Sequence, residues 1–159
     1  MELPLDVVRC NFRRELEVAL ARAPLFEFKL VGDVDALTLR AEFTALDGEK
    51  FILVGTFDDY RLKPPLLDFV EPDTGLVGTA RASPKRAGAD SFFYGPGIIC
   101  APFSRKAYAQ VHRDWPMNEW SKSVAHGTSW SQYSTISSML ALVSAKLRSP
   151  DSYGGGRMG

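Results

Sequence analysis

The sequence has few residues of the kinds that build disulfide frameworks or metal sites, and no long hydrophobic run. It contains two cysteines and two histidines among 159 residues. That is too few cysteines for the dense disulfide framework of small secreted domains. No run of about eighteen apolar residues occurs, so no membrane-spanning helix is expected. Because the first residues also lack the basic and then apolar pattern of a secretory signal, we expect a cytoplasmic protein with free thiols.

An excess of charge of either sign is also missing. The chain has 19 acidic and 19 basic residues, so it carries no basic field of the kind that attracts nucleic acid. We therefore expect no nucleic-acid partner. Because no apolar run is long enough to span a bilayer, we expect no membrane partner either. Apolar residues make up 45% of the chain and charged residues 24%, which is ordinary for a globular fold. A chain of this length buries a sizeable core without disulfides or metals, and one domain is expected.

The hydrophobic pattern predicts a helix followed by an antiparallel meander. Residues 5–21 carry apolar side chains at three- and four-residue steps, which predicts one apolar stripe made of Leu5, Val8, Phe12, Leu16 and Leu20. Short apolar runs with period-two alternation then predict four strands, at residues 26–30, 37–46, 51–57 and 66–70. Asp47-Gly48 is a strong hairpin signal between the second and third of them.

The second half of the chain is less regular. Residues 71–90 are rich in glycine, proline, alanine and charge, which predicts a long loop. A last helix is predicted over residues 131–148, and residues 152–159 are predicted to be a mobile glycine-rich tail. The apolar face of that helix is formed by Ile136, Leu140, Val143 and Leu147. Helices beside an antiparallel sheet predict an α+β fold, with residues 1–151 as one domain.

Cys100 lies in the most unusual segment of the sequence. Residues 94–102 read YGPGIICAP, with two glycines and two prolines around an apolar pair. Such a segment holds the backbone in a tight extended path and presents a side chain on a shallow surface. A thiolate is an intrinsically good nucleophile, so covalent acyl chemistry is one interpretation and a buried, inert cysteine is the other.

Four motifs in order resemble the ubiquitin-conjugating (E2) family. Residues 60–69, YRLKPPLLDF, are similar to the family segment Y-P-x-K-P-P-x-x-x-F, and residues 97–100, GIIC, to its active-site G-x-I-C. Residues 130–137, WSQYSTIS, are similar to W-S-P-x-x-T-I-S, which opens the helix after the active site. Residues 147–151, LRSPD, resemble the L-x-x-P-N that closes that helix. The resemblance covers nearly the whole chain.

The resemblance implies an enzyme with a UBC-like fold. Cys100 would accept a ubiquitin-like protein as a thioester from an E1-like activating enzyme and transfer it to an amine on a target protein, with no cofactor and no metal. The N-terminal helix, through Arg9, Arg13 and Arg14, would help to dock the activating enzyme.

The sequence departs from common E2 enzymes in three ways. Asp90, Ser91 and Phe92 occupy the positions of the family's His-Pro-Asn, whose asparagine orders the site or stabilises an oxyanion. An insertion at about residues 103–129 holds both histidines, His112 and His126. The two C-terminal helices of common family members have no counterpart. These features resemble the bacterial E2-like proteins of antiphage conjugation operons of the Bil type.

Three further side chains are candidates for supporting the reaction at Cys100. His126 is flanked by small residues, which would let it approach another backbone and support Cys100. Asp151 and Asp90 are acidic residues that would help to deprotonate an attacking amine. A lysine, with a pKa near 10.4, is mostly charged at neutral pH and needs such help.

Two other functions stay open on the sequence alone. One is a non-catalytic E2-variant or RWD-like binding module, although such proteins typically lack the cysteine. The other is a cysteine hydrolase that pairs Cys100 with His112 or His126, which requires hydrogen-bond contact between them. Zinc binding by these three residues is disfavoured, because their spacing matches no compact finger and structural zinc sites usually take four ligands.

Overall fold

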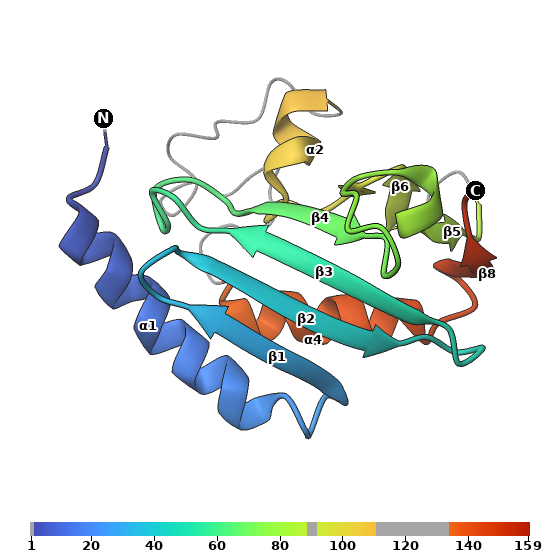
Figure 1. Cartoon of the computed structure of the whole chain (residues 1–159), viewed down its shortest axis with the longest axis horizontal. Helices are drawn as coiled ribbons and strands as arrows, with labels where there is room; N and C mark the ends of the chain where they lie inside the picture. The colour runs from blue at the N-terminus through green and yellow to red at the C-terminus, as the bar shows by residue number, and fades with distance from the viewer. Residues whose placement is uncertain (1, 89–91, 111–133) are drawn as a thin grey trace.

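The fold is built around an antiparallel meander of four strands, described here by a computed structural model that covers residues 2–88, 92–110 and 134–159 (Figure 1). In chain order its elements are α1 (Leu5–Arg22), β1 (Phe28–Asp33), β2 (Thr38–Thr44), β3 (Lys50–Thr56), β4 (Leu66–Val70), the short 3-10 helix η1 (Ala80–Ala82), β5 (Pro84–Arg86), β6 (Phe93–Gly95), β7 (Ile98–Ile99), α2 (Arg105–Gln110), α4 (Ile136–Leu147) and β8 (Tyr153–Arg157).

The meander sheet has the strand order β1-β2-β3-β4, and each neighbouring pair is antiparallel. Its two faces differ, because successive side chains of a strand point to opposite sides. In β2, Leu39, Ala41 and Phe43 are buried, whereas Arg40 between them is exposed. The predicted four-stranded meander is therefore confirmed. The first strand runs from Phe28 to Asp33, later in the chain than the predicted residues 26–30.

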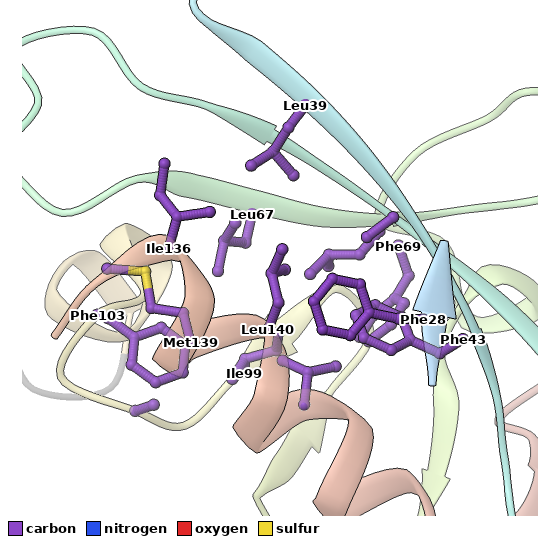
Figure 2. Close-up of a cluster of buried hydrophobic side chains, with 14 of the residues drawn as sticks. Phe28, Leu39, Phe43, Leu67, Phe69, Ile99, Phe103, Ile136, Met139 and Leu140 are labelled. Atoms are coloured by element: carbon purple, nitrogen blue, oxygen red, sulfur yellow. The ribbon is translucent and has the colours of Figure 1, made fainter. Parts of the chain in front are cut away.

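Helix α4 covers the apolar face of the sheet, and α1 packs against both α4 and β1 (Figure 1). In Figure 2, Ile136, Met139 and Leu140 of α4 face Leu39 and Leu67 of the sheet. The four residues of the predicted apolar face of α4 are all buried. The helix starts at Ile136, because the Thr135 side chain caps it in a capping box with Ser138. Residues 131–133 of the predicted helix lie outside the described residues.

Helix α1 matches the predicted bounds closely, but its buried stripe differs from the predicted one. Val8, Phe12 and Leu16 are buried as expected. The prediction was wrong for Leu5 and Leu20, which are 52% and 43% exposed, because Ala19 takes the last contact position. The helix touches the core along a narrow face only, since it packs at the edge of the sheet. No helix in the described residues is both long and apolar enough to cross a membrane.

The C-terminal segment corrects two predictions. Residues 152–159 are not a mobile tail, because β8 pairs antiparallel with β5, which itself lies in the predicted loop at 71–90. Tyr153 is buried and donates a hydrogen bond to the Asp47 carboxylate at 2.8 Å. Arg157 lies over the Phe51 ring, 4.5 Å from its centroid, and pairs with Glu49 at 3.0 Å. These contacts fasten the glycine-rich strand to the β2–β3 hairpin.

Candidate functional site

Cys100 directly follows a small hairpin that the core holds in place. Strands β6 and β7 pair antiparallel, with Phe93 opposite Ile99, and the Cys100 N–H donates to the Phe92 carbonyl at 2.8 Å. Ile99 is fully buried and belongs to the same core cluster as the α4 residues (Figure 2). Ala101 on the other side is buried too, whereas Cys100 itself is partly exposed. The thiol is therefore presented at the surface by a backbone anchored on both sides.

The turn of this hairpin requires a glycine at position 97. Gly97 has a φ of +68°, in the left-handed region that disfavours side chains. A Cβ there would also lie 2.8 Å from the Gly78 Cα, closer than two such carbons approach. The Gly97 N–H donates to the Ser83 hydroxyl at 2.8 Å inside the protein. The backbone conformation and the close packing against Gly78 thus explain why this position of the G-x-I-C motif is a glycine in this chain.

The Cys100 thiol is partly desolvated by its surroundings. Burial raises the pKa of the Cys100 thiol above its ordinary value, because a thiolate is less well solvated there. The Lys106 ammonium, which lies beside Gly78 and Gly97, forms an ion pair with Asp68. Reactive cysteines of proteases and redox enzymes instead have lowered pKa values. The shift at Cys100 is in the opposite direction.

Phe92, which the sequence resemblance aligns with the asparagine of the E2 His-Pro-Asn motif, is an aromatic residue. Phe92 is buried against the Phe93 ring, 5.2 Å between centroids, and the Lys146 ammonium of α4 lies 5.9 Å from its centroid. A phenyl ring offers no hydrogen-bond donor to an oxyanion. The contribution of Phe92 is its carbonyl, which accepts the Cys100 N–H. Asp90 and Ser91 lie outside the described residues.

Two of the sequence motifs meet at the start of α4. Tyr60, from the YRLKPP segment, donates a hydrogen bond to Glu15 of α1 at 2.7 Å. The same carboxylate accepts the Ile136 N–H at 3.0 Å, at the N-terminus of α4, where a negative charge is favourable. Arg61 also donates to the Ser134 carbonyl and lies 3.8 Å from Glu15. These contacts connect three parts of the chain: α1, the segment before β4, and the N-terminus of α4.

The other predicted site residues are not brought to Cys100 by any described contact. Arg13 and Arg14 are exposed on α1, and Arg9 donates to the Asp35 carbonyl at 3.3 Å. Asp151 is exposed in the turn before β8, where its N–H bonds the Ser149 hydroxyl. This contact does not place its carboxylate against the thiol. His112 and His126, with most of the predicted insertion at 103–129, lie outside the described residues.

The start of the predicted insertion belongs to the core. Phe103 and Ser104 are fully buried, and α2 follows them at Arg105. Within the described ranges, no group of three or more His, Cys, Asp or Glu side chains is arranged to hold a metal ion. Cys10 is exposed on α1, and neither cysteine forms a disulfide.

Sequence reasoning missed two residues beside the hairpin, Ser83 and Lys106. Neither belongs to a recognisable motif, and both act through contacts with residues distant in sequence. The only local hint is Gly97, whose left-handed turn needs a hydrogen-bond acceptor for a buried N–H.

Comparison with known proteins finds no matching family model, no matching curated protein and no matching solved structure.

Proposed function

We propose that the chain is an E2-like conjugating domain with a UBC-like fold, which carries a ubiquitin-like protein as a thioester on Cys100. The observation that carries the proposal is the placement of this thiol. It is partly exposed at the end of a hairpin whose neighbouring residues are buried in the core. The order of elements, a helix, a meander, the cysteine and then α4, agrees with the family that the motifs resemble. A role in bacterial antiphage defence belongs to the same proposal.

In the first step, the Cys100 thiolate attacks the thioester carbonyl that joins the ubiquitin-like protein to an E1-like enzyme. A new carbon–sulfur bond to Cys100 forms as the bond to the activating enzyme's sulfur breaks. The departing thiolate takes up a proton equivalent to the one that Cys100 released. One thioester replaces another, so the step needs proximity and orientation more than stabilisation of charge.

In the second step, a neutral amine of a target protein attacks the Cys100 thioester. An amide bond forms, the Cys100 thiolate leaves, and the amine proton passes to solvent or to a nearby base. Asp151, Asp90 and His126 stay candidates for supporting this step. Arg9, Arg13 and Arg14 on α1 stay candidates for docking the activating enzyme.

The test is reconstitution with a candidate activating enzyme and ubiquitin-like protein from the gene neighbourhood, with ATP, followed by a non-reducing gel. We expect a heavier band that disappears with added thiol and with Cys100→Ala. The matched control is Cys10→Ala, which removes the other, exposed thiol and should keep the band. Cys100→Ser should give an ester band that resists thiol.

The opposite outcome is equally informative. If an activating enzyme that charges itself gives no band with any variant, the carrier role is wrong. The E2-variant binding module then becomes the better interpretation, with Cys100 as a packing residue. Hydrolysis of the ubiquitin-like protein's C-terminal thioester without conjugation would instead favour a cysteine hydrolase.

A further inference from the structure

Ser83 lies at the junction of three segments that are distant in the sequence. Its hydroxyl accepts the N–H of Gly97 at 2.8 Å and donates to the Thr79 carbonyl at 2.8 Å. Its own carbonyl accepts the N–H of Met158, at 3.0 Å, just after β8. Ser83 is 1% exposed, so water does not substitute for these bonds. One residue thus links the C-terminal strand, the segment before β5 and the turn before Cys100.

The Gly97 bond fixes the hairpin at its most constrained point. Gly95 pairs with Ile98 across the turn, and Cys100 follows two residues later, roughly 7 Å along an extended chain. The backbone of Gly97 is in the left-handed region and buried against Gly78. Without the Ser83 hydroxyl, its N–H would be buried with no acceptor there. Strand β7, which leads to Cys100, would then lose the hydrogen bond that fixes the residue just before it.

The C-terminal strand holds Ser83 from the other side. Arg157 donates to the Ala82 carbonyl at 3.2 Å, next to Ser83, while its ion pair reaches Glu49 on the β2–β3 hairpin. Ser83 directly precedes β5 and Met158 directly follows β8, so the pairing of these two strands keeps the Met158 bond to Ser83 beside the Arg157 contacts. The β2–β3 hairpin of the meander sheet therefore fixes β8, and β8 in turn fixes Ser83. The Ser83 hydroxyl then fixes Gly97 through its hydrogen bond.

We propose that Ser83 is a positioning residue for Cys100: its hydroxyl fixes the Gly97 turn, and β8 supports that hydroxyl, so that the thiol stays partly shielded and in one orientation. The importance of this role for conjugation rests on the proposed function. The positioning itself does not, because it can be measured on the thiol with a small reagent.

The experiment measures alkylation of Cys100 by iodoacetamide in a Cys10→Ser background, across a range of pH. Ser83→Ala removes the acceptor of the Gly97 N–H and leaves the Ser83 carbonyl in place. A looser turn exposes the thiol, so its pKa should fall back toward the ordinary value. We expect the pH profile to move to lower pH, with roughly threefold to tenfold faster alkylation near neutral pH. The Gly97 amide should exchange its hydrogen roughly tenfold faster.

The matched control is Ser144→Ala, because Ser144 is also buried and donates one bond, to the Phe26 carbonyl at 2.8 Å, away from the hairpin. Urea is added to this control until its free energy of unfolding equals that of Ser83→Ala. The control should keep the wild-type pH profile, since general destabilisation does not act on the turn. If both variants have the same profile, or if Ser83→Ala keeps the wild-type profile and Gly97 protection, the proposal is wrong.

A second variant keeps the test decisive if Ser83→Ala does not fold. Truncation after Arg157 removes the Met158 bond to Ser83 and keeps all of β8. It should move the Cys100 profile in the same direction by a smaller amount. No movement in this folded variant would overturn the supporting role of the C-terminal strand. If either variant shifts the profile while no thioester forms on the wild type, the positioning stands and the carrier function fails.

Discussion

At the scale of single residues, Gly97 is the position where the hairpin before Cys100 tolerates no side chain. Gly97→Ala would place a Cβ 2.8 Å from the Gly78 Cα and force a left-handed φ on an alanine. We expect a loss of about 1–3 kcal/mol in the free energy of unfolding, measured by urea denaturation.

Gly95 gives this substitution a control within the same hairpin. It lies two residues earlier, and a Cβ there would meet nothing within 4 Å. Gly95→Ala should therefore change the free energy of unfolding by about 0.5 kcal/mol or less. Equal losses for the two alanine variants would show that the turn accommodates a side chain and that Gly97 is not structurally required.

At the scale of elements, the Asp47 carboxylate is one of the groups that hold β8. Burial tends to raise the pKa of this carboxyl. The hydrogen bonds it accepts from Tyr153, Glu49 and Gly156 outweigh that effect, so the pKa lies below the ordinary value. Because the pKa is lower in the folded state, the ionised carboxylate stabilises the fold at pH values above the unfolded-state pKa. This stabilisation is lost as the pH falls through the folded-state pKa. The attachment of β8 should therefore weaken below about pH 4.

Hydrogen exchange at the Gly156 amide measures this weakening, because that N–H donates to Asp47 at 3.0 Å. Its protection factor should fall between about pH 5 and pH 3, by a small amount because Asp47 is exposed to solvent. Asp47→Asn should show low protection throughout that range. Asp35→Asn, at an exposed carboxyl in another turn, should keep the wild-type profile. An unchanged profile in Asp47→Asn would show that the carboxylate does not hold the strand.

The elements also differ in how far the sequence predicts them. The buried face of α4 was predicted correctly, because the apolar residues that form it recur every 3.6 residues and this spacing is visible in the local sequence. Strand β8 could not be read, because its glycines carry no pattern and its partners, Asp47 and Glu49, lie about a hundred residues earlier in the chain. For the same reason GIIC pointed to Cys100, whereas Ser83 had no sequence signal. Local periodicity and motifs are visible in a sequence, and long-range polar contacts are not.

At the scale of the whole molecule, one continuous core supports both the sheet and the hairpin of Cys100. Ile99 shares its cluster with Leu140 of α4, which is 2% exposed. Leu140→Ala should cost about 2–5 kcal/mol of unfolding free energy, and Leu25→Ala, at a leucine 74% exposed, about 0.5 kcal/mol or less. In urea, loss of helical circular dichroism and exposure of Cys100 to alkylation should coincide. Exposure of the thiol well before the dichroism changes would show that the hairpin unfolds separately.

The pairing of β5 with β8 has a further consequence for the order in which the chain folds. Their contact closes a loop through residues 87–152, whereas the meander forms from neighbouring segments. Long loops close slowly, since their ends must find each other before any contact compensates for the lost entropy. The support for the Gly97 turn is thus expected to form after the sheet. Until then Cys100 is a thiol on an incompletely folded chain, open to oxidation, so a reducing environment matters most during synthesis and refolding.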